Sequence, residues 1–522
     1  MLTSIADYLD NGASLGQDEP CVTFGNRTRS YREVQEISYG VTRALYRSGI
    51  REGDKVGILS SNDPVAYSCI FGIARRGAVW APINPRNEAD ENREILDLID
   101  CACLIFQNAY APLVEKIAAK LPKLTVLVCL DADLPWAGSF DDWIAGAADD
   151  TLEDALGRSP DDVAMIFGTG GTTGRSKGVM LTNRNVDMQS ALTLIPYPYR
   201  GRPVFLAMAP LTHAAAMISF PMLALGGQIV IMPKPDLTRF LQLIPQHRVT
   251  HSFLPPTLIY LLMQHEDLPA ADFSSMQCLL FGSAPISAAR LGEALEKIGP
   301  FIGQLFGQSE APMISMMPPA DYFNEDGSIA THRLASAGKP SPLVTLAIMD
   351  GDGKLVERGE RGERGERGEI VLRSAVVMAG YYNNPEATAE AWRHGWHHTG
   401  DVGYLDEDGY LYIVDRAKDM IISGGFNVYS AEVEQALMVH PAIGECAVVG
   451  LADAKWGERV TAVVVPRPGT DVDTGDVIAF VKAKIGSVKA PKQVEVWSDL
   501  PRSKLGKILK ADVRARLNAA PS

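Results

Sequence analysis

Residues 168–178 read GTGGTTGRSKG and have the composition of an anion-binding loop. Five glycines let backbone N–H groups approach an anion closely, while four hydroxyl side chains and Lys177 add donors and positive charge. The spacing does not match the GxxxxGK[ST] pattern of a P-loop, because Lys177 lies between Ser176 and Gly178. We therefore predict a phosphate-binding loop of another kind. The alternative is a flexible surface turn.

A second group of polar residues lies in residues 305–312, LFGQSEAP. Glu310 follows an aromatic residue, a glycine, an amide and a hydroxyl within five positions. Mg²⁺ in nucleotide sites is held by one or two carboxylates together with substrate phosphates. Glu310 is therefore a candidate magnesium ligand. Considered alone, it has the more ordinary interpretation of a surface carboxylate.

A third group occupies residues 396–416, WHHTGDVGYLDEDGYLYIVDR. We predict that Asp401 lies in a turn flanked by glycines and that Arg416 ends a strand. A carboxylate can accept two hydrogen bonds from ribose hydroxyls, and a guanidinium can bind phosphate or ribose oxygens in a fork. This pair could hold a nucleotide, although two isolated residues of these types are more often structural.

The C-terminal segment LPRSKLGKILK, residues 500–510, holds four cations in eleven residues and has little periodicity. Lys507 follows Gly506 there. From composition alone such a segment is a solvated tail.

The overall charge limits which ligands and partners are expected. The chain has 522 residues, 46% of them hydrophobic and 21% charged, with a formal net charge of −14. This charge argues against nucleic acid and anionic membranes as partners, so any phosphate must be held by local positive charge. The seven cysteines suit neither a disulfide framework nor metal-ligand spacing, and the N-terminus lacks a secretion signal. We predict reduced thiols and a cytoplasmic protein.

The segment 203–233 contains no Asp, Glu, Lys or Arg. It is long enough for a membrane span. Several prolines and glycines and His213 interrupt the segment. We predict a buried strand, a loop, a helix and a second strand instead of a membrane span.

The elements that must position these groups follow an alternating pattern. A strand at 21–24, a turn at 25–30, a helix at 31–49 and a strand at 55–60 begin a series of apolar strands separated by helix-length segments. Such alternation is typical of a parallel α/β sheet. A chain of this length forms two or more domains.

The pattern changes after Arg416 to a compact region of helices and strands. We predict an α/β protein with a large N-terminal domain of layered sheets and helices, residues 1–416, and a small, mobile α+β C-terminal domain, residues 417–522. The repeated ERG triplets at 357–366 predict a solvated loop.

Several motifs in the right order resemble those of the adenylate-forming superfamily of acyl-CoA synthetases, firefly-type luciferases and peptide-synthetase adenylation domains. The resemblance spans nearly the whole chain. The matched segments are GTGGTTGRSKG (phosphate loop), FGQSE (aromatic–Gly–x–Thr–Glu motif), TGD at 399–401 (ribose motif), DRAKD (interdomain hinge) and PRSKLGK (catalytic-lysine motif).

The resemblance implies a role for each matched residue. In the phosphate loop, ATP would be held by Thr169, Gly171, Thr172, Thr173, Gly174 and Lys177. Phe306 would stack on adenine, and the neighbouring contacts would come from Gly307, Ser309, Gly282, Ser283 and Ala284. Glu310 would bind Mg²⁺, and Asp401 and Arg416 would hold the ribose.

The same resemblance implies residues for the chemical steps. Lys507 would bridge the substrate carboxylate and the α-phosphate, and Lys418 would be the pivot between domains. Gly425 would line the pantetheine tunnel. His213 would gate the acyl pocket, although without the resemblance a buried core histidine is the simpler interpretation.

The implied function is an acyl-CoA synthetase that activates a carboxylic acid as acyl-AMP and transfers it to CoA by domain alternation. The expected cofactors are ATP, Mg²⁺ and CoA, the expected partners are small molecules, and a homodimer is one possible assembly. Three small residues after His213, Ala214 to Ala216, predict space for a bulky apolar acid.

Two alternatives remain. Gly170, Ser176 and Ser309 stand where the family usually has serine, proline and threonine, which suggests an enzyme that mainly thioesterifies a supplied adenylate with weak adenylation. The second alternative is a non-catalytic adenylate-binding relative, against which the presence of both Lys507 and Glu310 argues. A free-standing adenylation enzyme for a carrier protein is a less favoured interpretation.

Overall fold

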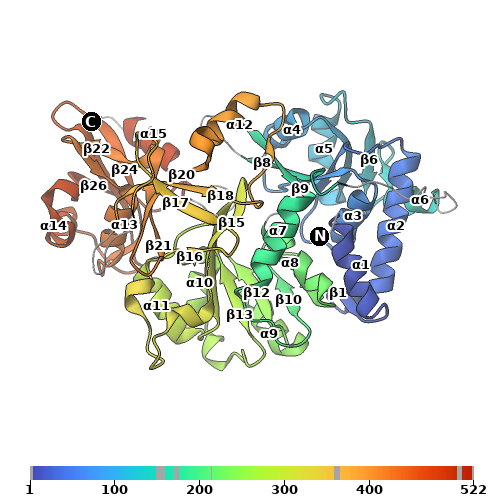
Figure 1. The fold of residues 1–522 in the computed structure, drawn as a ribbon, viewed down its shortest axis with the longest axis horizontal. Coiled ribbons are helices and arrows are strands. Elements are labelled where there is room, and N and C mark those ends of the chain that lie inside the picture. The colour runs from blue at the N-terminus through green and yellow to red at the C-terminus, as the bar shows by residue number, and fades with distance from the viewer. Residues whose placement is uncertain are drawn as a thin grey trace.

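The computed structural model describes residues 4–147, 159–169, 176–212, 214–357, 365–502 and 508–519. Within these ranges the chain forms a large N-terminal domain of three sheets with covering helices and a small C-terminal domain (Figure 1). This arrangement confirms the α/β prediction. In Figure 1 the small domain lies at the opposite end of the molecule from the N-terminal helices, and the third sheet lies between them.

An eight-stranded sheet has the order β19-β9-β8-β4-β3-β5-β6-β7. Its strands are β3 (Lys55–Leu59), β4 (Val79–Ile83), β5 (Cys101–Phe106), β6 (Val126–Cys129), β7 (Gly138–Ser139), β8 (Val163–Thr169), β9 (Lys177–Thr182) and β19 (Gly380–Tyr381). The helices connecting its parallel strands are α3 (Pro64–Arg75), α4 (Ala89–Leu98), α5 (Ala111–Ala118) and α6 (Phe140–Ala145). Strand β9 runs antiparallel to both β8 and β19.

A nine-stranded sheet has the order β16-β15-β14-β13-β12-β10-β11-β1-β2. Its strands are β1 (Pro20–Phe24), β2 (Arg27–Ser30), β10 (Val204–Ala207), β11 (Gln228–Ile231), β12 (His251–Leu254), β13 (Cys278–Phe281), β14 (Ile302–Gln308), β15 (Ala311–Met317) and β16 (Lys339–Pro340). The helices of this part are α7 (Asn183–Leu194), α8 (Ala214–Ala224), α9 (Leu237–His247), α10 (Pro256–Met263) and α11 (Ala288–Lys297). The central strands from β1 to β14 are parallel, as the alternating pattern predicts.

The N-terminal helices show how local sequence starts these elements. Helix α2 (Tyr31–Arg47) begins with a capping box, in which Ser30 and Glu33 each accept a hydrogen bond from the other's backbone N–H. Helix α1 (Ala6–Leu15) packs against α2 and α8. The turn predicted at 25–30 is wrong in part, because β2 occupies its second half. Gly25, at φ +59°, closes a tight hairpin between β1 and β2.

The apolar segment at 203–233 forms β10, α8 and β11, as predicted. Nearly all of α8 is buried, including its internal Pro221. None of the helices that the structure describes is long and apolar enough to cross a membrane. The seven cysteines are free and buried.

The third sheet of the large domain is antiparallel, with the order β17-β18-β20-β21. Its strands are β17 (Thr345–Met349), β18 (Gly368–Arg373), β20 (His397–Leu405) and β21 (Leu411–Arg416), and helix α12 (Pro385–Ala391) precedes β20. Asp401 lies inside β20, so the predicted glycine-flanked turn is wrong. Gly400, at φ +71°, and a bulge at Val402–Gly403 accommodate the two glycines without ending the strand.

The small domain is built around a long hairpin. Its strands are β22 (Ile421–Ser423), β23 (Phe426–Val428), β24 (Ile443–Asp453), β25 (Gly457–Pro466) and β26 (Gln493–Val496), and its helices are α13 (Ser430–Met438), α14 (Thr474–Lys489) and α15 (Lys510–Ala519). The helices and strands predicted after Arg416 are confirmed. Valines from β24, β25 and α14 form its separate core.

Candidate active site

The phosphate-loop residues that the structure describes lie at the ends of β8 and β9. Thr169 pairs with Lys177 across the antiparallel ladder, and the Thr169 hydroxyl donates a hydrogen bond of 3.3 Å to the Lys177 carbonyl. The predicted ligands Gly171, Thr172, Thr173 and Gly174, together with Gly170, lie outside the described residues. The two strands therefore hold Thr169 and Lys177 side by side at the base of the loop.

Gly168 is required by packing. A Cβ atom at this position would lie 2.7 Å from the Ile95 side chain, which extends from α4. The glycines of residues 168–178 predicted a backbone that approaches an anion. At Gly168 the structure instead shows a glycine that allows close contact between a strand and a helix.

Lys177 and Glu310 are linked by Tyr381, which the sequence analysis did not single out. The Lys177 ammonium lies 4.6 Å from the centroid of the Tyr381 ring. The Tyr381 hydroxyl donates a hydrogen bond of 2.9 Å to Glu310 Oε1. The signal in the sequence was the segment AGYYNNPE at 379–386, with a glycine and two tyrosines just before an Asn-Pro helix start.

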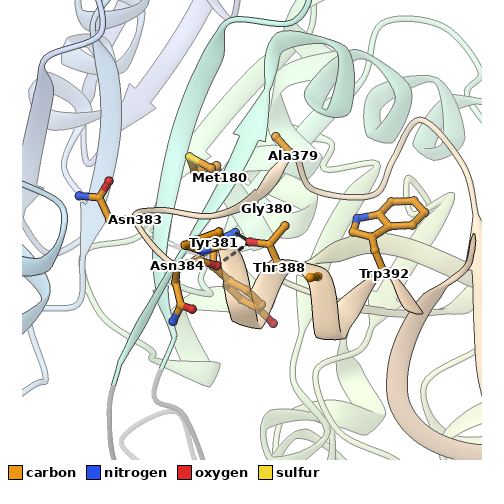
Figure 2. Close-up of a pocket in the computed structure, with 10 residues that line it drawn as sticks. Met180, Ala379, Gly380, Tyr381, Asn383, Asn384, Thr388 and Trp392 are labelled. Atoms are coloured by element: carbon orange, nitrogen blue, oxygen red, sulfur yellow. Dashed lines mark hydrogen bonds between the residues drawn. The ribbon is translucent and has the colours of Figure 1, made fainter. Parts of the chain in front are cut away.

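Burial and then the nearby Glu310 carboxylate raise the pKa of Tyr381 well above its usual value. The phenol therefore stays protonated at neutral pH and remains a hydrogen-bond donor. Figure 2 shows Tyr381 beneath Met180 and beside Asn384. A cavity of about 460 Å³ lies at this point between β9, β19 and α12, and its lining includes Tyr381, Thr388 and Trp392.

Glu310 lies in the two-residue turn between β14 and β15. Gln308 and Ala311 pair across this turn, and the Met378 N–H donates to the Glu310 carbonyl at 2.8 Å. The backbone of Glu310 is thus held on both sides. The side chain is half-buried and not a fully exposed surface carboxylate.

The predicted adenine-side residues lie at the carboxyl ends of two parallel strands. Strand β13 runs directly into Gly282, Ser283 and Ala284, and β14 carries Phe306 and Gly307. A Cβ at Gly282 would approach Leu305 at 2.9 Å, and one at Gly307 would lie 2.1 Å from the Pro312 carbonyl oxygen. Ser283 has φ +69°, which is unusual for a residue with a side chain. Half-buried Ser309 directly follows β14.

Asp401 and Arg416 face each other across β20 and β21. They are paired in register, and Arg416 Nε lies 2.6 Å from Asp401 Oδ1. The Asp401 side chain is 5% exposed and that of Arg416 is 39% exposed. The Asp401 N–H donates to the Thr399 hydroxyl, and the Thr399 carbonyl accepts from Gln308 Nε2 at 3.3 Å. Gln308 therefore connects the Glu310 turn to the predicted ribose strand.

The small domain contacts the end of β21 through a cluster of charged and polar groups that we call the domain junction: Asp415, Ser430, Glu434 and Lys510. The Ser430 hydroxyl donates to Asp415 Oδ2 at 2.6 Å and accepts from the Lys510 ammonium at 2.5 Å. The same ammonium lies 2.8 Å from Glu434 Oε1. Burial alone would lower the pKa of Lys510, but the Glu434 and Asp415 carboxylates outweigh it and raise this pKa.

The remaining predicted residues are placed only in part. His213 and Lys507 lie outside the described residues, and Lys418 lies in a short 3₁₀ turn, Ala417–Asp419, directly after β21. Gly425 is at the tip of the β22–β23 hairpin with φ +80°. Apart from its chain neighbours, no atom of the described residues lies within 4 Å of the position of a Cβ there.

Comparisons with known proteins agree with this arrangement. The family model of the AMP-binding enzymes matches residues 9–382, and that of the AMP-binding enzyme C-terminal domain matches residues 432–507. A medium/long-chain-fatty-acid–CoA ligase (FadD8) of Mycobacterium tuberculosis is 34% identical over 515 residues, covering 96% of this chain and 88% of the ligase. A feruloyl-CoA synthase of an Amycolatopsis species is 35% identical over 508 residues, covering 97% of each. The crystal structure of the anthranilate CoA ligase AuaEII with anthranoyl-AMP has a TM-score of 0.89 at 26% identity, covering 99% of this chain and 98% of that one.

Proposed function

We propose a substrate class and a set of residue roles for this chain, which belongs to the AMP-binding enzyme family and is an acid–thiol ligase of the AMP-forming type. The enzyme uses ATP, Mg²⁺ and CoA and works through an acyl-AMP intermediate. The proposed acid is bulky and apolar. The proposed domains are residues 1–416 and 417–522.

In the adenylation half-reaction, the acid's carboxylate oxygen attacks the α-phosphorus of ATP and pyrophosphate leaves. We assign Lys177 and the loop threonines, Thr169, Thr172 and Thr173, to the phosphates. Asp401 and Arg416 are assigned to the ribose and Phe306 to adenine. The observation that carries this assignment is the Lys177–Tyr381–Glu310 contact, which brings a cation and a carboxylate from two sheets to one place.

The donor set fits Mg²⁺. Glu310 offers a carboxylate oxygen beside the proposed phosphate position, and the described part of the chain has no group of three or more acidic, histidine or cysteine side chains suited to a metal. Phosphate oxygens and water would complete the shell, as is usual for this ion. The ion would neutralise charge developing on the phosphates.

In the second half-reaction the CoA thiol attacks the acyl carbon and AMP leaves. We propose that Lys507 stabilises the adenylation transition state and then withdraws as the small domain turns about Lys418, which lets Gly425 approach the site. The position of Lys418 directly after β21 supports this role, because a change in its backbone angles would turn every element that follows.

The substrate class rests on the start of α8. Ala214 is half-buried, and Ala215 and Ala216 are buried. Three small side chains thus follow His213, the proposed gate, in the sequence, and we propose that their small volume leaves room for a bulky acid. The relatives named above act on long-chain, feruloyl and anthranoyl groups, which are also large.

The test is a panel of acids from propionate to polycyclic carboxylates, assayed separately for pyrophosphate release and for thioester formation. Ala214→Phe should lower turnover of the best bulky acid about tenfold relative to propionate, because it fills the pocket. Ala224→Phe, at the other end of α8, serves as the matched control. Equal effects on large and small acids would contradict the pocket assignment.

An enzyme that mainly thioesterifies a supplied adenylate is the second candidate, favoured by Gly170, Ser176 and Ser309. Pyrophosphate exchange distinguishes the two, because only an efficient adenylating enzyme returns labelled pyrophosphate to ATP. We also propose a cytoplasmic location, supported by seven free, buried cysteines. Homodimer formation is a further proposal, which ultracentrifugation tests.

A further inference from the structure

We propose that Tyr381 is a positioning residue that orients the Glu310 carboxylate and the Lys177 ammonium toward magnesium-bound ATP. The proposal rests on the assignment of Glu310 to Mg²⁺ made above. It goes beyond that assignment because Tyr381 comes from a different segment, which joins the phosphate loop and the metal carboxylate into one unit.

The hydroxyl of Tyr381 determines which way the Glu310 side chain points. It donates to Oε1 at 2.9 Å, which leaves the second carboxylate oxygen for a ligand. The backbone of Glu310 is already fixed by the β14–β15 turn and by the Met378 N–H. With its backbone and one oxygen held, the carboxylate keeps a single orientation, a form of preorganisation that strengthens metal binding.

The ring of Tyr381 restricts the position of the Lys177 ammonium. The Lys177 ammonium lies over its face at 4.6 Å, within the range of a cation–π interaction. A lysine side chain loses considerable rotamer freedom when it is held. Contact with a fixed aromatic face reduces the freedom that remains to be lost when phosphate binds.

Tyr381 itself is firmly anchored (Figure 2). It pairs with Val179 of β9, the strand that begins with Lys177, so both residues belong to one sheet. The Tyr381 N–H donates to the Thr388 hydroxyl at 2.9 Å, and that hydroxyl donates to the Asn384 carbonyl at 2.8 Å. A Cβ at Gly380 would lie 2.8 Å from the Thr388 methyl, so the chain passes α12 closely.

The neighbouring Tyr382 provides a matched control. Successive side chains of a strand point to opposite faces. The Tyr382 hydroxyl donates to Asp100 at 2.9 Å and accepts from Lys55 at 3.0 Å, so it also joins a carboxylate and a lysine, but away from Glu310. Removing its hydroxyl tests the same chemistry outside the proposed site.

The experiment measures binding of an ATP analogue with a non-hydrolysable α,β-bridge by calorimetry, with and without Mg²⁺, in the full-length protein. Tyr381→Phe should reduce the Mg²⁺-dependent gain in affinity about tenfold, because it frees the Glu310 carboxylate. It should leave binding without Mg²⁺ nearly unchanged, because the ring remains. Tyr382→Phe should leave both values within about twofold.

Tyr381→Leu separates the two roles of the side chain. Loss of the ring should lower affinity without Mg²⁺ by a further two- to fivefold, about what a surface cation–π contact contributes. Thermal unfolding of each variant shows whether the fold is kept. Equal loss of affinity with and without Mg²⁺ in Tyr381→Phe, or an effect no larger than that of Tyr382→Phe, would overturn the proposal.

Glu310→Gln distinguishes failure of this inference from failure of the site. If Glu310→Gln removes the Mg²⁺-dependent gain and Tyr381→Phe does not, the role of Tyr381 is wrong and the metal assignment stands. If Glu310→Gln keeps the gain, the metal assignment is wrong and the inference falls with it. The double variant should bind no more weakly than Glu310→Gln alone, because the two changes act on one interaction.

Discussion

The proposed nucleotide-binding face of the large domain and the domain junction are stabilised in different ways. At the nucleotide face, Thr169 and Lys177, Asp401 and Arg416, and Tyr381 and Val179 are partners in strand registers. At the junction the two domains meet through side chains: the Ser430 hydroxyl donates to Asp415, and Arg367 lies 3.5 Å from Glu432. Within the small domain, Lys510 supports this contact by binding Ser430 and Glu434.

The difference matches what each region has to do. A strand register cannot shift without breaking many backbone hydrogen bonds, so groups placed by it keep their positions through a reaction. A pair of side chains that crosses between domains, such as Arg367 and Glu432, can separate and form again in water at small net cost. Four of the groups proposed to bind ATP, Thr169, Lys177, Asp401 and Arg416, therefore lie in registers, and the surfaces proposed to exchange during domain rotation meet through charged and polar side chains.

The largest expected effect concerns the group that the small domain delivers. Lys507→Ala should slow acyl-adenylate formation by about a hundred- to a thousandfold, because one donor to developing charge in a transition state contributes that much. Thioester formation from a supplied adenylate should stay near the wild-type rate. Pyrophosphate release and thioester formation, each measured in single turnover, check this. Equal loss in both half-reactions would contradict a role confined to adenylation.

The next prediction concerns the junction. Lys510→Met should lower the free energy of unfolding of the small domain by about 3 kcal/mol, because it leaves the Glu434 and Asp415 carboxylates without their cation. Unfolding by urea, followed by the fluorescence of Trp456 and Trp497, measures the free energy of unfolding of the small domain. A probe in this domain is needed because one two-state value does not describe a protein of two domains.

Lys489→Met is the matched control for that change. Lys489 pairs with Glu432 at 2.6 Å but is 31% exposed, against 18% for Lys510, and Arg367 also contacts Glu432. The expected loss is below about 1 kcal/mol. If the two variants lost the same stability, the junction would be no more than an ordinary surface ion pair.

The smallest expected effect is a loss of stability at low pH caused by a histidine in β20. His397, at the start of β20, is 1% exposed, and neither ring nitrogen has a hydrogen-bond partner among the described residues. Burial, and then the nearby His398, lower the pKa of His397 to about 4. Between pH 6.5 and 4 the unfolded chain therefore binds more protons than the folded one, and stability falls as pH falls.

The fall in the free energy of unfolding caused by His397 should reach about 2 kcal/mol at pH 5 and vanish above pH 7. His397→Phe should remove this contribution, so that the unfolding midpoint depends less steeply on pH. His394→Phe, at an exposed ring three residues earlier, should leave the slope unchanged. An unchanged slope in His397→Phe would show that another group causes the acid sensitivity.

Much of the fold could be predicted from the sequence, because its signals are local. Apolar runs such as 79–83 and 278–281 predict strands, and their alternation with helical segments predicts parallel sheets. Both features are present in the structure. The prediction at 25–30 was wrong in part because the polar residues 27–30 pair with β1 as a strand. The prediction at Asp401 was wrong because glycine permits both a turn and a strand bulge, and only the neighbouring strand decides between them.

The sequence by itself determined the types of group at the site: a glycine- and hydroxyl-rich loop ending in Lys177, a carboxylate at Glu310 and a carboxylate–guanidinium pair at Asp401 and Arg416. Composition and order within short segments specify these, because each motif is contiguous. The net charge of −14 likewise argued against nucleic acid and anionic membranes as partners without any structure.

The tertiary structure alone decided which of these groups meet. Tyr381 lies 71 positions from Glu310 along the chain, and Lys510 lies 80 positions from Ser430, yet each pair is within hydrogen-bonding distance. Such contacts depend on strand order and on the packing of whole sheets, which no local pattern encodes. The most recognisable loop could therefore be identified from the sequence, and Tyr381, which connects Lys177 of that loop to the proposed magnesium ligand Glu310, could be identified only from the fold.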